Sequence, residues 1–288
     1  MENKSKKANK TLREFLPYGK ADDAGGRVPV KEDNAARRQK VRKVFIRTLS
    51  IVLWLVIWQV IALVLNKNVI LPTPIKTVLA LVELSKTSEF WISLLNSFSK
   101  ILLLALPIAI IIGLFLAILA YKSKIIKAML SPAMGVLNSI PVASFIILAL
   151  VWIGGSALST FVSVLMVVPI VYNNVYAGLV AVPNEYIEVA DVFGKTGAEK
   201  IRLVYIPAVL PFFATAVRVG IGFAWKSGIS AEILGYPQHT IGGHISDAKN
   251  YLLTNDLFAW TAALIILSLL FERACVFALK RVEERKYF

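Results

Sequence analysis

The segment Pro183–Pro211, PNEYIEVADVFGKTGAEKIRLVYIPAVLP, is the longest polar-containing interruption in the hydrophobic part of the chain. Long apolar runs flank it on both sides, which places it between two candidate membrane spans. It mixes charged residues with apolar residues at helical spacing. The pattern predicts a docking element for a partner protein outside the membrane.

Composition limits the class of protein. Of the 288 residues 57% are hydrophobic, more than a soluble fold of this size can bury, so the sequence predicts an all-α polytopic membrane protein. The net charge is +14, and 14 of the 32 Lys and Arg residues precede Thr48. That distribution indicates a basic tail at an anionic membrane surface and no nucleic-acid binding. The single Cys275 excludes an intramolecular disulfide and a cysteine-based metal site.

Six apolar stretches are each close to the roughly 20 residues that cross a bilayer. They are residues 44–65, 98–120, 131–153, 157–180, 208–234 and 256–279. We therefore expect a transmembrane domain over 44–288 after a largely disordered basic tail, 1–43. Proline and glycine inside the spans indicate bent helices around a cavity.

The distribution of Lys and Arg predicts the orientation. With the tail inside, the inner segments contain 13 such residues in 1–43 and ten more after it, whereas the outer segments contain four. The outer four are Lys67, Lys76, Lys86 and Lys249. The positive-inside rule then places both termini and the segment 183–211 in the cytoplasm. In the outer segment 66–97, apolar residues spaced by three and four from Ile75 predict a short amphipathic helix.

Local signals divide the segment 183–211 into two short helices. Asn184 is a candidate N-cap, Gly194 stands where a glycine ends a helix, and Thr196 with Glu199 has the spacing of a capping box. An ordinary amphipathic loop on the membrane surface is equally compatible with this spacing. Gly194-Lys195-Thr196 imitates the end of a P-loop, but the required earlier glycine is Val189. If ATP drives this protein, another subunit hydrolyses it.

The run Glu188-x-Ala190-x-x-x-Gly194, followed by Ile206-Pro207, resembles the "EAA" signature of permease subunits of bacterial ABC importers. The family usually has a second alanine where this chain has Val189. LPTP at 71–74, SIPVASFIILALVWIG at 139–154 and FAWKSGISAEILG at 223–235 resemble the nitrate/sulfonate/taurine branch of these permeases. The resemblance covers residues 44–285.

The resemblance implies a type I ABC importer permease fold with six transmembrane helices and cytoplasmic coupling helices over 183–207. It also implies a homodimer in the bacterial cytoplasmic (inner) membrane, two ATPase subunits that bind ATP and Mg, and an extracytoplasmic substrate-binding protein. This chain would carry no cofactor of its own. Its coupling residues would be Glu188, Ala190, Gly194 and Pro207, with the glycine at the bend and the alanine letting the helix seat closely.

The fifth span contains the charged residues Arg218, Lys226 and Glu232. Charges inside a membrane face a cavity or pair with each other. Arg218 and Glu232 share one helix face, which favours ion pairs that involve Glu232, whereas Lys226 points away and is the better candidate for contact with an anionic substrate. Asn138, Ser144 and Asn173 are further candidates for the pathway; interhelical hydrogen bonds are the alternative for each.

The leading hypothesis is a permease subunit that moves a small anionic solute of the nitrate, sulfonate or taurine kind. A stand-alone secondary transporter or channel, or an ABC permease for a heterocyclic vitamin precursor, are the alternatives. A membrane enzyme would need a nucleophile with its base or a metal cluster, and the sequence offers neither. His239, His244 and Asp247 fit no tight ligand spacing, and we expect them in a solvated outer loop.

Overall fold

The computed structural model describes residues 31–284, with side chains for most of 39–275 and for Phe277. The chain divides into two units, Met1–Val56 and Ile57–Phe288, and each is described by itself. Most of the expected tail, residues 1–30, lies outside the described residues. Residues 31–43 already belong to helix α2 (Lys31–Leu65), which starts 13 residues before the expected first span. Lys, Arg, Ala, Glu and Gln are good helix formers, so this helix is not limited to its apolar part.

The described part of the second unit consists of helices joined by short turns and loops. Its elements are α3 (Pro74–Ser85), α4 (Ser88–Phe98), η1 (Ser99–Ala105), α5 (Leu106–Lys122), α6 (Lys124–Ser139), α7 (Val142–Trp152), α8 (Gly155–Val180), α9 (Asn184–Val192), α10 (Gly197–Lys200), η2 (Ile201–Tyr205), α11 (Ile206–Gly235), α12 (Ile241–Asn250) and α13 (Thr254–Glu284). Among the described residues, five continuous helices are long and apolar enough to cross a membrane, or six if the pair α6–α7 counts as one broken span.

The expected third span, 131–153, is not a straight helix. Helix α6 ends at Ser139 and α7 begins at Val142, with an angle of 106° between them. Pro141 causes the break, because a proline disfavours helical backbone in the residue before it. Ile140 is accordingly extended, with φ −70° and ψ 127°.

Two other prolines are absorbed without a break. Pro107 and Pro207 each follow a short π-helical segment, η1 and η2. At the end of these segments Leu106 N–H bonds the Ile101 carbonyl and Ile206 N–H bonds the Ile201 carbonyl, each five residues back. The wider turn accommodates the proline, which has no N–H to donate. The second and fifth spans therefore belong to longer helices, 88–122 and 197–235.

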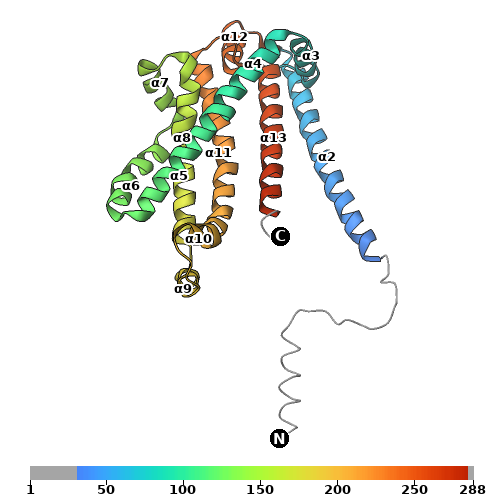
Figure 1. The fold of residues 1–288 in the computed structure, drawn as a ribbon. Coiled ribbons are helices and arrows are strands. Elements are labelled where there is room, and N and C mark those ends of the chain that lie inside the picture. Colours follow the sequence, from blue (N-terminus) through green and yellow to red (C-terminus); the bar gives the residue numbers. More distant parts are fainter. Residues whose placement is uncertain (1–30, 285–288) are drawn as a thin grey trace. The chain divides into compact units, whose positions relative to one another are not determined.

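Helix α8 is the centre of the second unit and packs against α5 and α11 (Figure 1). Glycines allow the close approach. A Cβ on Gly113 would lie 2.6 Å from the Val171 Cβ, and one on Gly228 would lie 2.5 Å from the Ser163 Oγ. Ser163 also donates to the Ala224 carbonyl across the α8–α11 contact, at 3.0 Å. Small residues and such hydrogen bonds are the usual means of helix association in membranes.

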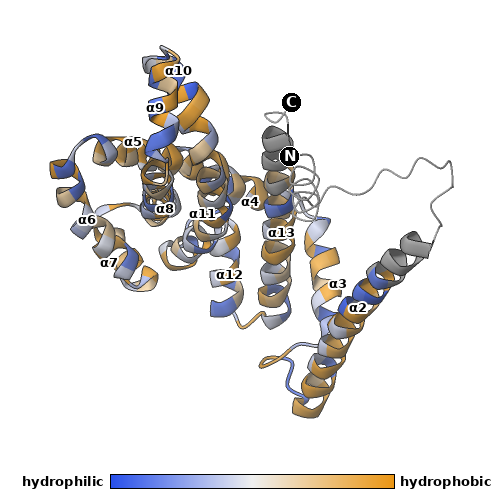
Figure 2. Ribbon diagram, turned by 90° about the horizontal axis from the view of Figure 1, so that it is seen from below, coloured by the Kyte–Doolittle hydropathy of each residue, from blue (hydrophilic) through white to orange (hydrophobic). Residues whose placement is uncertain are grey.

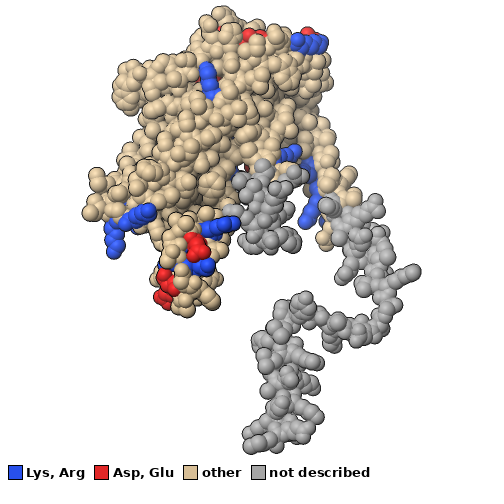
Figure 3. All heavy atoms as spheres, in the orientation of Figure 1, with Lys and Arg blue, Asp and Glu red and all other residues tan. Residues whose placement is uncertain are grey.

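The two ends of the second unit differ. Helices α9 and α10 lie at one end, called here the α9 end, and α3 and α12 lie at the opposite end, the α12 end (Figure 1). Hydrophobic residues cover long stretches of the outward faces of the helices between them (Figure 2). Over this unit, the charged side chains visible in Figure 3 gather mainly near the two ends. On the face that Figure 3 shows, the band between the ends carries few charged side chains, which suits the hydrocarbon core of a bilayer.

The expected outer amphipathic helix corresponds to α3. It begins at Pro74, directly after Thr73, whose side chain accepts a hydrogen bond from the Lys76 N–H at 3.3 Å. Proline at the first helical position and a threonine N-cap both favour this start.

The glycine contacts of α5 provide a test of the packing. Gly113→Ala should destabilise the protein by about 1–3 kcal/mol, because the added methyl overlaps Val171 in a packed interface. The melting temperature of the purified protein in detergent measures the effect. Gly135→Ala is the matched control, since its Cβ would meet nothing within 4 Å and alanine favours helix. Equal melting temperatures for the two variants would contradict the packing described here.

Candidate functional site

The segment between α8 and α11 contains a tight glycine bend. Helix α9 ends in front of Gly194, whose φ is +65°. The Gly194 N–H bonds the Asp191 carbonyl at 2.9 Å, and the Lys195 N–H bonds the Ala190 carbonyl at 2.8 Å. This pair of bonds is a Schellman motif, which requires a left-handed residue and so favours glycine. The position agrees with the bend expected from the sequence.

The caps of the two helices differ from expectation. Asn184 is the first residue of α9, and Pro183 stands at the N-cap without a side-chain bond. The capping box does not form: Thr196 is the N-cap of α10, but its side chain caps nothing. The Glu199 carboxylate instead pairs with Lys195 at 3.0 Å, because this exposed cation competes for it. Helix α10 is also not a separate helix, since it continues through η2 into α11.

An apolar groove lies between α9 and the η2–α11 helix. Its volume is about 600 Å³. Its lining consists of Tyr186, Val189, Ala190, Phe193, Lys195, Leu203, Val204, Pro207 and Ala208. Ala190 is buried, whereas Val192 and Phe193 on the adjoining turn are 85% and 75% exposed, and Glu188 is exposed too. Exposed apolar surface of this kind usually marks a contact with another molecule.

The three charged residues of α11 do not meet. Arg218 and Lys226 are exposed, and Glu232 is fully buried. Glu232 Oε2 accepts hydrogen bonds from the Ser97 hydroxyl at 2.8 Å and from the Gly242 N–H at 3.1 Å. Within the described residues Glu232 forms no ion pair. The helical wheel ignored distance along the axis: 14 residues separate Arg218 from Glu232 by about 21 Å.

Asn173 lies at about the same level as Arg218. Helices α8 and α11 are antiparallel neighbours, because Gly178 lies against Phe212 and Gly220 lies against Val167. That register sets Asn173 opposite the turn of α11 that precedes Arg218. Asn173 is exposed, so both helices present a polar side chain outside the packed core at this level.

Asn138 and Ser144 lie on α6 and α7, on either side of the Pro141 bend. Both are exposed. In the part of the chain that is described, neither side chain forms a hydrogen bond to α8 or α11. No hydrogen bond among the described residues links Asn138 or Ser144 to Arg218 or Lys226, although α7 itself packs against α11.

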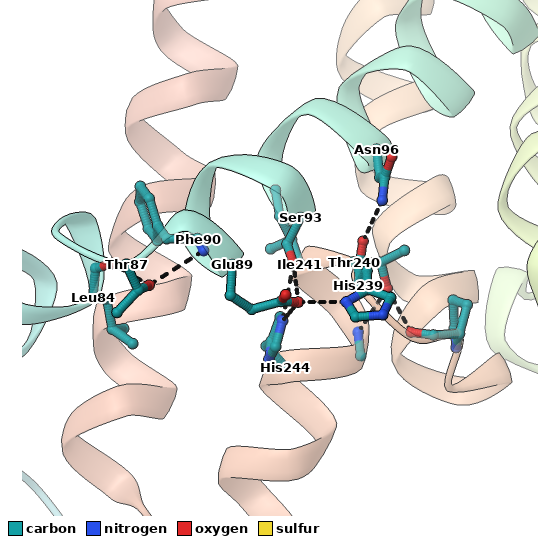
Figure 4. Close-up of polar contacts among 12 residues, drawn as sticks. Leu84, Thr87, Glu89, Phe90, Ser93, Asn96, His239, Thr240, Ile241 and His244 are labelled. Atoms are coloured by element: carbon teal, nitrogen blue, oxygen red, sulfur yellow. Dashed lines mark hydrogen bonds and ion pairs between the residues drawn. The ribbon is translucent and has the colours of Figure 1, made fainter.

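A polar network at the α12 end was missed by the sequence analysis (Figure 4). The Glu89 carboxylate on α4 contacts His239 Nδ1 at 2.8 Å and His244 Nε2 at 3.0 Å. His244 is only partly exposed and stacks on Trp260, with 4.6 Å between ring centroids. The expected solvated loop is therefore largely an ordered helix, α12, held to α4 and α13. The two histidines lie about 150 residues from Glu89, so no local pattern reveals the contact.

Two further polar groups at this end were not predicted. Tyr236 donates a hydrogen bond to Asp247, and this bond raises the pKa of the Tyr236 hydroxyl. Lys100 lies inside the expected second span and is half-buried. A charge inside an apolar span is the signal in the sequence that distinguishes Lys100.

Comparisons with known proteins agree with the resemblance seen in the sequence. Residues 109–287 match the family described as binding-protein-dependent transport system inner membrane component. The putative aliphatic sulfonates transport permease protein SsuC of Bacillus subtilis (strain 168) is 30% identical over 243 residues, 82% of this chain and 87% of the relative. The taurine transport system permease protein TauC of Escherichia coli (strain K12) is 27% identical over 257 residues, 85% of this chain and 93% of the relative.

A solved structure shares the fold. The crystal structure of an amino acid ABC transporter with histidines matches 67% of this chain and 91% of its own chain, with a TM-score of 0.52 and 21% identity. The family match and the relatives named as transport permeases identify a non-enzymatic transport component. The chain belongs to the family of binding-protein-dependent transport system inner membrane components and is a multi-pass membrane permease of the ABC importer type.

Proposed function

We propose that this permease works as a homodimer with two copies of a separate ATPase and an extracytoplasmic binding protein, and imports a small anionic solute. The ATPase subunits bind ATP and Mg. The observation that carries this proposal is the segment α9–α10, with its apolar groove and exposed Phe193 at one end of the membrane-spanning helices. An apolar groove beside an exposed phenyl ring suits a docking contact with the ATPase subunit.

Each predicted coupling residue has a physical part in this contact. Gly194 holds the bend, and buried Ala190 leaves room in the groove beside Pro207. Exposed Glu188 is free to pair with a cation of the ATPase. Since 197–235 is one continuous helix, displacement of α10 moves α11 directly, without an intervening loop.

The exposed charges on α11 support a water-filled pathway. A charged side chain at the centre of a membrane costs about 2.5–3.5 kcal/mol on insertion scales, so such residues face a cavity or a partner. Arg218 and Lys226 are exposed in this chain, with Asn173 at the level of Arg218. A two-fold symmetric dimer that pairs these faces would enclose four cations around its axis. Buried Glu232 has a different part: it holds α11 to α4 and α12.

The solute class follows from the cations and from the relatives. Cations along the pathway favour an anion over a cation. The two relatives described above are named as permeases for aliphatic sulfonates and for taurine. We infer a small sulfonate-like anion for this chain.

The orientation in the bacterial inner membrane follows from charge. The α9 end carries the Lys and Arg residues 122, 124, 127, 195, 200 and 202. The positive-inside rule favours this end on the cytoplasmic side, and the 13 Lys and Arg residues of 1–43 independently favour a cytoplasmic N-terminus.

Reconstitution in liposomes tests the function. The permease co-expressed with the ATPase and binding protein of its gene neighbourhood should take up sulfonate only when all subunits and ATP are present. Uptake by the purified permease alone would overturn the proposal and favour a secondary transporter or channel.

The docking surface gives a sharper prediction. Phe193→Asp should lower the amount of ATPase that co-purifies with the permease at least tenfold, because a carboxylate replaces an exposed phenyl ring in an apolar contact. Quantitative gel densitometry of the purified complex measures the ratio. Tyr251→Asp, an equally drastic change at an exposed aromatic of the α12 end, should leave the ratio unchanged. Equal loss in both variants would indicate general misfolding.

The pathway gives a second prediction. Lys226→Met and Arg218→Gln should each lower uptake at least tenfold at normal expression and normal ATPase co-purification, because the anion loses an attracting charge. Lys86→Met is the control, since Lys86 is exposed on the surface and pairs with Glu83. Full uptake by both pathway variants would contradict the assignment.

A further inference from the structure

Lys100 is a cation that forms no ion pair with any other described residue. It lies in η1, is half-buried, and its side chain forms no hydrogen bond or ion pair with any described residue. Its backbone carbonyl accepts a bond from the Thr160 hydroxyl at 3.3 Å, which fixes η1 against α8. The helix continues 22 residues to Lys122, about 33 Å, which matches the thickness of the hydrocarbon core. Lys100 therefore lies at headgroup level at the α12 end.

Lys100 also lines an apolar groove, at the end of the groove nearest the α12 end. The groove has a volume of about 840 Å³ and lies between α5, α6, and the start of α8. One wall is a ladder of residues at spacing four on one face of the helix: Lys100, Leu104, Ile108, Ile112 and Leu116. Ser156 and Thr160 are the other polar residues of the lining. The groove thus has a cationic, hydroxyl-bearing end and a long apolar remainder.

The acidic groups at the α12 end are mostly engaged elsewhere. Glu83 pairs with Lys86, Glu89 with two histidines, and Asp247 with Tyr236. Glu232 attracts Lys100 electrostatically, but its Oε2 already accepts hydrogen bonds from the Ser97 hydroxyl and the Gly242 N–H. Asp256 lines a separate pocket of about 210 Å³ with Asn68 at the start of α13. In a second copy, Glu83, Glu89, Asp247 and Glu232 would have these same partners, which favours an anion from another kind of molecule for Lys100.

We propose that this groove binds one anionic phospholipid, with the phosphate against Lys100 and Ser156 and an acyl chain along the Leu104–Leu116 ladder. The cationic end of the groove matches the phosphate of a phospholipid, and the apolar remainder matches its acyl chain. Exposed Trp152 at the end of α7 lies at the same headgroup level, where tryptophan is favoured. The lipid would cover the open side between α6 and the α5–α8 core, next to the end of α7.

Native mass spectrometry of the permease complex tests this site. The complex is released from nanodiscs of equal parts phosphatidylglycerol and phosphatidylethanolamine, and the lipids that remain bound are counted. The native protein should retain phosphatidylglycerol in preference, and Lys100→Gln should lower that retention at least fivefold. Lys249→Gln removes an exposed charge at the same end, outside the groove, and should have no effect. No headgroup preference in the native protein, or unchanged retention in Lys100→Gln, would overturn the proposal.

A groove-filling variant separates the lipid from the charge. Ala157→Trp keeps Lys100 but fills the lining of the groove, and should reduce retention of both lipids. Unchanged lipid retention in this variant, with an unchanged melting temperature, would place the lipid elsewhere and contradict the site.

Cross-linking distinguishes the lipid from a second permease. Ala157→Cys in a Cys275→Ser background should remain a monomer on a non-reducing gel after oxidation, and phosphatidylglycerol should slow maleimide labelling of the introduced thiol. A disulfide-linked permease dimer would show that the second copy fills the groove and would overturn the proposal. Both results concern binding alone, so they stand apart from the proposed transport function.

Discussion

The close contact of α8 with α5 and α11 is the interaction on which the rest of the structure depends. It requires glycine at positions where a methyl group would overlap a neighbouring helix, as at Gly113 and Gly228. Since lipid offers no hydrophobic driving force between helices, this fit supplies the association. The same contact decides which side of α11 remains uncovered, and that side carries Arg218 and Lys226. The packing of one face of α11 against α8 thereby leaves exposed the face that carries the proposed pathway residues.

The two ends of the helices are held by interactions of different strength. At the α12 end, buried Glu232 accepts two hydrogen bonds that join α11 to α4 and α12, and breaking such bonds costs about 1–3 kcal/mol each. At the α9 end, α9 and α10 are joined by a glycine bend and by the ion pair between Asp191 and Lys200, and ion pairs near the surface contribute about 0.2–1 kcal/mol. In the proposed mechanism the segment α9–α10 is therefore the part that the ATPase displaces, and the continuous helix 197–235 transmits the displacement into the membrane.

The sequence predicted what depends on local patterns. Apolar length located the helices, proline and threonine located the start of α3, and the spacing around Gly194 predicted the bend. The predictions from the sequence were wrong where tertiary contacts determine the local structure. The third span broke at Pro141, although Pro107 and Pro207 were absorbed by π-helical turns, and the sequence alone does not distinguish these outcomes. The capping box at Thr196 was wrong because Lys195 takes the Glu199 carboxylate. The contacts of Glu232 and of Glu89 join residues far apart in the chain, so periodicity carried no information about them.

The most direct measurement is the water accessibility of position 173 in the assembled transporter. In a Cys275→Ser background, Asn173→Cys is treated with a charged thiol reagent, with and without a non-hydrolysable ATP analogue on the ATPase. The thiol at position 173 should react, and its rate should change at least tenfold on nucleotide binding, because it lines a pathway that the motor moves. Ile111→Cys on α5, whose exposed side chain faces the hydrocarbon, should stay unreactive in both states. A thiol at 173 that is as unreactive as the one at 111 in every state would show that the charged face of α11 does not line the pathway.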